Sequence, residues 1–416
     1  MTDYLVVYRY TVTLGFNRDR LTWVVYVVAG WFAYLQASPG LVVVHLRDEL
    51  GLSYSVGGLH VAAFAAGSTA AGVISTRLER WLGRRRLLWS AVAVLAAGVI
   101  GLTAGCTAGV TVGSVLIMGI GGGLVLVTIQ AVLADHHGEH RTVALAEENV
   151  AASIAYLVLI GTLSVAAALQ LGWRVALLAS LVIPLLAWFS SRRVVIEAPP
   201  PSRVVGGRLP TVFWIAAAVL FCTTAAEWCV TAWGAAFIED AARVSADTAI
   251  TLMAGYFGGV LVGRTLGSQL ARRYSPARLL AGALAVTAAG FAILSPSTAW
   301  APVLIGLSLM GIGLGNLFPM GVSLAVGLAP DRAALASGRV VAVSSFAVVL
   351  APLTVGTLAD ATSLKAALGV VPVMVALAAA GLALIGPIRT RTQASSPPET
   401  ADAQSGTWSK AAMGEE

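Results

Sequence analysis

One carboxylate stands in an otherwise uncharged apolar stretch of this 416-residue sequence. Glu227 lies within Thr223–Trp233, which reads TTAAEWCVTAW, and no other charged residue occurs from 211 to 238. A helix rises about 1.5 Å per residue, so Glu227 would lie roughly 28 Å beyond Arg208 and roughly 20 Å before Asp240. Burial of an ionised carboxylate is costly, and we therefore expect the protein to use this group.

Two chemical roles are open to Glu227. Burial favours the neutral form of a carboxyl group, so Glu227 could take up and release a proton, or bind a substrate, during a working cycle. Alternatively, it could remain protonated and act as a structural hydrogen-bond donor. No Lys or Arg occurs at the same depth along the predicted helices, and we expect Glu227 to lack a cationic partner.

A second group of charges lies nearer one end of the apolar segments. Glu148, Arg264 and Arg339 each stand seven or eight residues inside a segment, counted from an arginine at its end. That spacing places all three about 10–12 Å inside the boundary. Asn149 is the internal-repeat counterpart of Arg339. We interpret the three charges as a cytosolic-side gate; the alternative is that they extend to the lipid headgroups.

Further polar and aromatic side chains within apolar segments are candidates for lining a shared cavity. Aromatic rings with a few amides suit a ligand that stacks and hydrogen-bonds, such as a sugar or an aromatic metabolite. Trp and Tyr also serve as interface anchors, which is the alternative interpretation. The candidates are Trp31, Tyr34, Gln36, Gln130, Asn149, Trp233 and Asn316.

The composition excludes most other classes of protein. Hydrophobic residues make up 58% of the chain and charged residues only 11%, whereas a soluble domain carries about 25% charged residues. The net charge of +6 comes from basic residues between apolar runs, without an aromatic-interleaved patch, which argues against nucleic-acid binding. The run HHGEH at 136–140 is not a HExxH metal motif, and no phosphate-binding or dinucleotide fingerprint occurs. We expect no enzyme activity, no metal and no cofactor.

Twelve apolar runs of about 20 residues predict twelve membrane-spanning helices in an all-α protein. They are 22–46, 55–77, 86–107, 110–134, 144–169, 172–190, 211–237, 248–270, 277–295, 301–327, 334–358 and 364–388. About 20 of the 26 basic residues fall on the side of both termini, which predicts cytosolic termini in a cell membrane. The predicted units are a cytosolic segment (1–20), two six-helix bundles (21–190 and 211–389), a cytosolic linker (191–210) and a disordered tail (390–416).

The two halves repeat one another in sequence. MGIGGG at 118–123 corresponds to MGIGLG at 310–315, and HLRDELGLS, which ends at Ser53, corresponds to FIEDAARVS, which ends at Ser245. Both pairs are 192 residues apart. A parallel duplication of six spans indicates two bundles related by a pseudo-twofold axis along the membrane normal.

Over roughly 21–390 the chain resembles the major facilitator superfamily of transporters. Residues 76–86, TRLERWLGRRR, keep four residues of the family's loop pattern G-x-L-a-D-R-x-G-R-[RK]. Arg80 stands where the pattern has an acid, and Glu79 comes one residue early, which puts the family's charge-relay role for this loop in doubt. The AAEW run at 225–228 resembles the sugar-permease-like branch.

This resemblance implies a monomeric secondary transporter that moves a small solute across the bilayer by alternating access, coupled to protons. It also implies that spans five and eight meet across the halves, with Glu148 beside Arg264. The stretch at 159–165 lacks the Pro of drug-efflux members, which favours metabolite transport over drug antiport and leaves the direction of transport open. The alternatives are a drug or metabolite efflux antiporter and, from other classes, a membrane sensor or an intramembrane enzyme.

Overall fold

The apolar runs form long helices, since a chain surrounded by lipid must satisfy its backbone hydrogen bonds internally. The computed structural model describes residues 16–191, 196, 207–271 and 273–394. Most of the predicted cytosolic N-terminal segment, linker and tail therefore lies outside the described residues.

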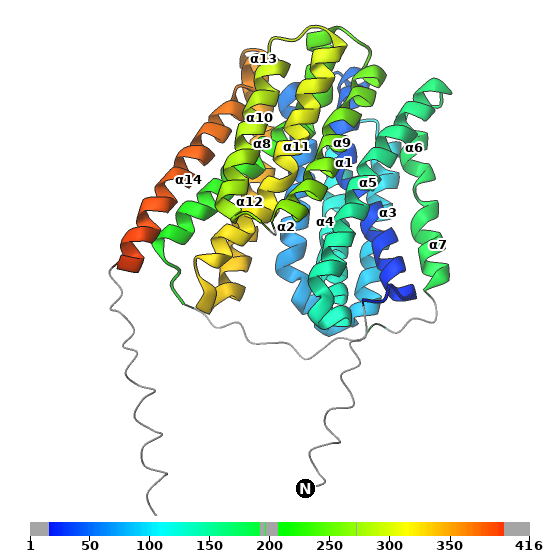
Figure 1. The fold of residues 1–416 in the computed structure, drawn as a ribbon. Helices are drawn as coiled ribbons and strands as arrows, with labels where there is room; N and C mark the ends of the chain where they lie inside the picture. Colours follow the sequence, from blue (N-terminus) through cyan, green and yellow to red (C-terminus); the bar gives the residue numbers. More distant parts are fainter. Residues whose placement is uncertain (1–15, 192–195, 197–206, 272, 395–416) are drawn as a thin grey trace, which may run out of the picture.

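The helices of the first half alternate in direction through the molecule (Figure 1). They are α1 (Arg20–Leu50), α2 (Tyr54–Leu82), α3 (Arg84–Ala104), α4 (Ala108–His137), the short η2 (Gly138–His140), α5 (Arg141–Ala168), α6 (Trp173–Ala179) and α7 (Val182–Ser190). Together α6 and α7 make one crossing, because they lie end to end within one apolar stretch.

The second half repeats this arrangement. Its helices are α8 (Thr211–Ala242), α9 (Ala246–Leu270), α10 (Pro276–Leu294), α11 (Trp300–Gly327), the short η3 (Pro330–Arg332), α12 (Ala333–Ala361), α13 (Leu364–Ala367) and α14 (Val370–Ala394). Within the described ranges, 11 stretches are long and apolar enough to cross a membrane, and one of them, Ala108–Ala168, contains both α4 and α5. The predicted twelve-span fold is thereby confirmed, although α3 ends at Ala104, three residues earlier than expected.

Capping residues reproduce the sequence repeat. The hydroxyl of Ser53 accepts a hydrogen bond from the backbone N–H of Val56 at the start of α2. The hydroxyl of Ser245 accepts the equivalent bond from Thr248 at the start of α9, again at 3.3 Å. A serine at this position satisfies one of the unpaired N–H groups of the first helical turn, so the same local signal starts the second helix of each half.

Close helix packing repeats in the same way. A Cβ added to Gly119 on α4 would collide with the carbonyl oxygen of Phe64 on α2. A Cβ added to Gly311 on α11 would collide with the carbonyl oxygen of Tyr256 on α9. Small residues let two backbones approach in this way, and both glycines belong to the MGIG repeats that mark the duplication.

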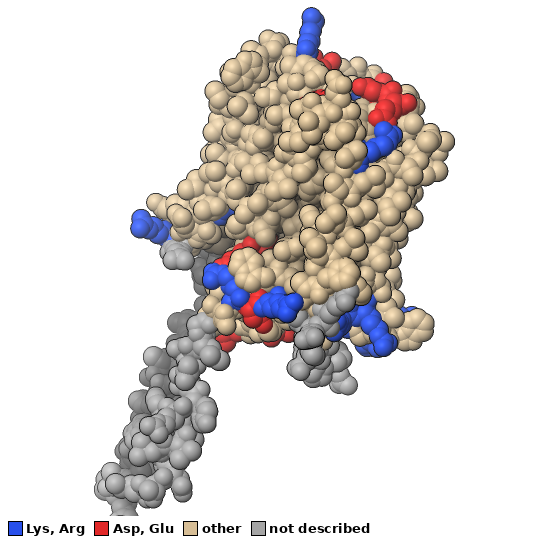
Figure 2. Space-filling model, turned by 90° about the vertical axis from the view of Figure 1, so that its right-hand side faces the viewer, with Lys and Arg blue, Asp and Glu red and all other residues tan. Residues whose placement is uncertain are grey.

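Charged residues gather toward the two ends of the molecule, with a broad uncharged band between them (Figure 2). We call the end at which α1 and α8 begin the basic end, and the end at which α1 and α8 finish the opposite end (Figure 1). The band fits the hydrocarbon core of a bilayer. The protein is therefore a multi-pass membrane protein.

The two halves meet most closely toward the opposite end. A Cβ on Gly40 of α1 would lie 2.5 Å from the carbonyl oxygen of Thr231 on α8, and one on Gly58 of α2 would lie 2.8 Å from that of Pro352 on α12. The Pro352 carbonyl also accepts a hydrogen bond of 2.9 Å from the buried Trp233 indole. Backbone thus packs directly on backbone along this seam.

Candidate functional site

A small cavity lies where four helices, α1, α5, α8 and α9, come together across the two halves. Polar and aromatic side chains dominate its wall. Its lining residues are Gln36, Ala37, Tyr156, Glu227, Trp228, Thr231, Tyr256, Phe257 and Val260. Pockets of this type, mostly apolar with a few convergent polar groups, are the usual form of a small-molecule site.

Helical spacing brings these side chains to one place. Glu227, Trp228 and Thr231 are one and four residues apart on α8, and such positions share one face of a helix. Tyr256, Phe257 and Val260 repeat this spacing on α9, and the two helices pack side by side. One face from each helix therefore supplies most of the wall.

The tyrosines form the polar contacts of the cavity. The Tyr256 hydroxyl donates to the carbonyl oxygen of Glu227 at 3.4 Å and lies 3.3 Å from the Thr231 hydroxyl. Within the first half, the Tyr156 hydroxyl on α5 donates to Gln36 Oε1 on α1 at 3.3 Å. The Tyr156 ring packs on that of Phe257 with centroids 5.0 Å apart, and so joins the first half to the second. The backbone carbonyl of Glu227 accepts the Tyr256 hydroxyl, and Glu227 is itself a lining residue.

Arg264 on α9 makes its hydrogen bonds with α5 and interacts electrostatically with Glu148 and Glu227. Its Nη1 donates to the Ser153 hydroxyl on α5 at 2.8 Å and to the Asn149 carbonyl oxygen at 3.3 Å. Its charge acts on Glu148, which is buried, and also on Glu227. One guanidinium thus interacts electrostatically with a carboxylate of each half.

Among the described residues Glu227 forms no salt bridge, yet it is not remote from positive charge, because Arg264 interacts with it electrostatically. Residue spacing along α8 and α9 places the Cα atom of Arg264 nearer the basic end than that of Glu227. The long, flexible arginine side chain carries its charge away from its own Cα, and α8 packs directly on α9. The charge of the Arg264 guanidinium therefore acts on the Glu227 carboxylate, although the two residues stand at different depths along the membrane normal.

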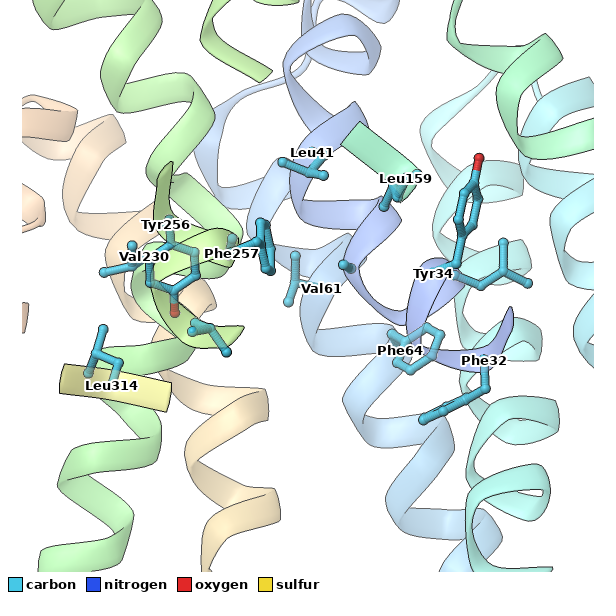
Figure 3. Packing of buried hydrophobic residues seen from close by; sticks show 14 of the residues in the cluster. Phe32, Tyr34, Leu41, Val61, Phe64, Leu159, Val230, Tyr256, Phe257 and Leu314 are labelled. Atoms are coloured by element: carbon cyan, nitrogen blue, oxygen red, sulfur yellow. The ribbon is translucent and has the colours of Figure 1, made fainter. Parts of the chain in front are cut away.

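Of the three predicted cavity residues on α1, Gln36 lines this cavity, whereas Trp31 and Tyr34 do not. The Trp31 indole donates to the Ser180 hydroxyl at 3.2 Å, inside the first half. The Tyr34 hydroxyl contacts Thr162 and donates to the Ala176 carbonyl at 2.9 Å. Tyr34 lies on the far side of α1 from Tyr256 and Phe257 (Figure 3). Positions two apart on a helix face roughly opposite ways, which separates Tyr34 from Gln36.

The remaining predicted residues lie elsewhere. Trp233 belongs to the seam between the halves, where it bonds to Pro352. Asn316 donates to the Gly263 carbonyl and packs α11 on α9. Gln130 and Asn149 are exposed, and the Asn149 amide donates to its own helix at Leu145.

Arg339 is set apart from the other two residues of the predicted gate. It is exposed on α12 and lines a different hollow with Arg208 and Trp214, at the basic end of the second half. Equal depth along the membrane normal does not place two residues on the same side of a bundle. Of the three, only Glu148 and Arg264 interact electrostatically, and they form no salt bridge.

Among the polar and aromatic lining residues, the sequence analysis did not select Tyr156, Thr231, Tyr256 and Phe257. A signal was present for three of them. Thr231 lies one helical turn beyond Glu227 and shares its face, and the Tyr256–Phe257 pair stands 192 residues beyond the buried Phe64 of the first half. Nothing in the sequence distinguishes Tyr156 from the other membrane-embedded aromatic residues.

The basic loop that departs from the family pattern still forms an ion-pair network. Arg84, nearly buried, contacts Glu79 through Nε at 2.7 Å and Asp135 of α4 through Nη1 at 2.6 Å. Glu79, one residue before the expected position, thus supplies a carboxylate to this network. In the HHGEH run, His136 pairs with Asp19 at 2.9 Å and His137 contacts Thr22, so these imidazoles hold the start of α1.

Comparison with protein families decides the identity of this fold. The family model described as Major Facilitator Superfamily matches twice, over residues 22–240 and 216–412, once for each half. The chain belongs to the major facilitator superfamily. It is accordingly a transporter rather than an enzyme, and the predicted family and fold are confirmed. No curated protein matches the sequence at a significant level.

Solved structures of the superfamily share this fold at low sequence identity. A D-xylose–proton symporter has a TM-score of 0.74 and 17% identity, with 88% of this chain and 97% of that one covered. A bacterial homologue of the human lysosomal transporter Spinster, in an inward-facing and occupied conformation, has a TM-score of 0.70 and 14% identity, with 90% and 98% covered. The nucleoside transporter NupG has a TM-score of 0.69 and 12% identity, with 88% and 98% covered.

Proposed function

We propose that this protein is a proton-coupled symporter that carries a small, uncharged polar solute with a ring able to stack on aromatic side chains. The cavity between the halves carries the proposal: Glu227 lies in a wall of aromatic and hydroxyl groups, and the charge of Arg264 acts on both Glu227 and Glu148. Sugars and nucleosides have this chemistry, and fold relatives include a D-xylose–proton symporter and a nucleoside transporter.

Separate groups carry out binding and coupling in this proposal. Gln36, Thr231 and Tyr256 present an amide and two hydroxyls to the solute, and Trp228 and Phe257 offer ring faces. Ring faces and hydroxyl or amide groups recognise a sugar or nucleobase without needing charge. Because the solute brings no charge, the ionisable groups of the cavity remain available for the proton.

Glu227 is the proposed proton-carrying group. When it is ionised, the Arg264 guanidinium stabilises it; when it is neutral, Arg264 remains held by Ser153 and the Glu148 charge. Protonation of one carboxylate therefore leaves the guanidinium with other partners. Such an exchange of partners can link proton uptake to the relative position of α5 and α9, which belong to different halves. Glu148 and Arg264 form the proposed gate on the cytosolic side.

The basic end is the proposed cytosolic end, following the distribution of Lys and Arg. Contacts between the halves join α2 to α12 and α1 to α8 and α9 toward the opposite end, and α5 to α9 down to Arg264. The described contacts at the basic end, such as Arg18 with Glu147 and Arg332 with the Arg208 carbonyl, each stay within one half. This pattern supports a carrier closed outside and open toward the cytosol.

Transport in proteoliposomes tests the coupling role. Glu227→Gln should abolish solute-driven proton uptake while it preserves counterflow of labelled solute, because exchange of solute requires no change of protonation. The matched control is Glu239→Gln, a half-buried acid on the same helix but outside the cavity, which should retain both activities. Unchanged solute-driven proton uptake in Glu227→Gln would overturn the assignment.

The same vesicles test the substrate class. We expect counterflow with a labelled pentose, hexose or nucleoside, and loss of counterflow in Trp228→Ala. Counterflow of only hydrophobic cations would instead identify an efflux carrier of the drug-transporting kind.

A further inference from the structure

A second hollow lies at the basic end of the second half, between the start of α8 and the start of α12. It holds about 930 Å³ of empty space and shares no lining residue with the cavity around Glu227. The residues that line it are Gly207, Arg208, Leu209, Thr211, Trp214, Leu335 and Arg339. The wall thus combines two guanidinium groups with an indole and two leucines.

Positive charge collects around this hollow. Among the described residues that line it, the charged ones are Arg208 and Arg339, and both are exposed. A third cation, Arg332, lies against Gly207 and donates to the Arg208 carbonyl. The salt bridges among the described residues involve none of these three arginines. Asp331, beside Arg332, is exposed and is not part of the lining.

The chemistry of the wall selects its ligand. Guanidinium groups present planar arrays of donors that match the oxygens of a phosphate, and often bind them in pairs. The remaining lining is apolar, and Trp214 leaves 47% of its surface exposed. Exposed tryptophans are enriched at the level of the lipid headgroups.

The position of the hollow along the membrane normal agrees with this. Arg332 directly precedes α12, and Arg339 stands seven residues farther along the chain. The two arginines therefore span about 10 Å, from the start of α12 into the apolar band. A ligand that fills the hollow therefore meets charge at its outer part and apolar surface farther in. Basic pockets between membrane helices on the cytosolic side are known recognition sites for anionic headgroups.

We propose that Arg208 and Arg339, with Arg332 beside them, bind the phosphate group of an anionic lipid, whose apolar part lies on Trp214 and Leu335. This site is independent of the transport cavity. The recognised chemistry is a phosphate ester, which could also come from a small soluble molecule, and the experiment separates the two sources.

Lipid binding to the purified full-length protein tests the proposal. Delipidated protein is titrated with phosphatidylglycerol, with phosphatidylcholine and with glycerol 3-phosphate, and bound ligand is followed by native mass spectrometry. We expect tight binding of phosphatidylglycerol, and a loss of affinity of roughly tenfold or more in the Arg208→Ala/Arg339→Ala double variant. The matched control is Arg77→Ala/Arg80→Ala, which removes two exposed arginines of α2 outside the hollow and should leave binding unchanged.

Further measurements separate loss of folding from loss of lipid binding. Melting of each variant without lipid reports whether it folds, and Arg208→Lys/Arg339→Lys keeps the charge if the alanine variant does not fold. Trp214→Ala should weaken phosphatidylglycerol binding and leave glycerol 3-phosphate binding unchanged. Glycerol 3-phosphate binding as tight as that of the lipid, lost in the double variant, would support the phosphate site with a soluble ligand as its source. Equal binding of phosphatidylcholine, or unchanged phosphatidylglycerol binding in the double variant, would overturn the proposal.

Discussion

Both donors of Ser55 converge on a single oxygen of Asp360. The backbone N–H of Ser55 lies 2.8 Å and its hydroxyl 2.5 Å from Asp360 Oδ2, while Oδ1 accepts from the Tyr54 N–H at 2.7 Å. The carboxylate at the end of α12, in the second half, thus caps the start of α2 in the first half. An acidic side chain at a helix N-terminus pairs with unsatisfied N–H groups and with the helix dipole. This contact fastens the two halves together at the opposite end.

Removal of the Asp360 carboxylate should make the two halves separate more often at the opposite end. In Asp360→Ala, the loss of three hydrogen bonds should favour the outward-open state by about 1–2 kcal/mol. A cysteine placed at Ala37 in the cavity, with the native cysteines removed, should then react roughly tenfold faster with an impermeant external maleimide. Asp240→Ala, which removes an exposed acid at the same end, is the control. Equal labelling rates in both variants would show that the contact does not hold the gate shut.

Closure of the opposite end should also depend on the absence of a side chain at Gly58. In Gly58→Ala the new methyl group would lie 2.8 Å from the Pro352 carbonyl oxygen and 3.2 Å from the Leu353 Cα, so α2 and α12 could not approach as they do. We expect counterflow to fall by roughly tenfold or more, since closure is needed in every cycle. Gly72→Ala, on the same helix with no atom within 4 Å of the new methyl group, should leave counterflow intact. It should also raise helix stability slightly, by about 0.5–1 kcal/mol.

The sharing of Arg264 between two carboxylates can be measured as coupling energy. Double-mutant cycles of Arg264→Ala with Glu148→Ala and with Glu227→Ala should each give a coupling of about 0.5–3 kcal/mol in unfolding free energy. Because the two acids compete for one cation, the coupling between Arg264 and Glu227 should grow when Glu148 is already alanine. The control cycle, Arg339→Ala with Glu227→Ala, should show additivity. Additivity in both Arg264 cycles would contradict the shared contact.

Asp19 should make the start of α1 sensitive to acid. Burial works to raise the pKa of the Asp19 carboxyl, but hydrogen bonds from Thr22 and the charge of His136 outweigh it and hold that pKa below its ordinary value. The carboxylate therefore stabilises the fold fully above the unfolded pKa, about 3.9, and this stabilisation is lost as pH falls through the lower folded value.

The corresponding measurement is melting of the detergent-solubilised protein between about pH 2.5 and 6. Asp19→Ala should cost about 1 kcal/mol at pH 6 through loss of the cap. Asp19→Asn keeps a capping oxygen, and its loss of stability on acidification should be smaller than that of the parent protein. Asp331→Asn, at an exposed site of the same end, should follow the parent curve. A parent-like curve for Asp19→Asn would assign the acid sensitivity to another group.

Much of the fold could be predicted because its signals are local or periodic. Apolar runs of membrane length gave the spans, and the 192-residue offset of MGIG and of Ser53 and Ser245 gave the duplication, which recurs in glycine contacts and helix caps. Glu227 could be selected because charge in an apolar run is rare, and Gln36 shared its cavity.

The composition of the site was harder to predict because spacing along a chain gives depth and not direction. Tyr34 and Gln36 are equally polar and two residues apart, yet only Gln36 faces the cavity. Arg339 has the depth of Arg264 but lies in another hollow. The link between Glu227 and Arg264 depends on how α8 packs on α9 and on where a long side chain extends, and neither is a property of a single helix.

The meeting of two carboxylates with one guanidinium has an electrical consequence. With Glu148 and Glu227 ionised, the three groups carry −1 − 1 + 1 = −1 elementary charge, and one bound proton makes them neutral. A carrier that crosses with an uncharged solute and one proton would then move no net charge on its loaded step. The voltage across the membrane, worth about 2.3 kcal/mol per elementary charge at 100 mV, would act on the return of the empty carrier instead. We expect voltage to set how fast the empty carrier resets, and to leave solute exchange unaffected.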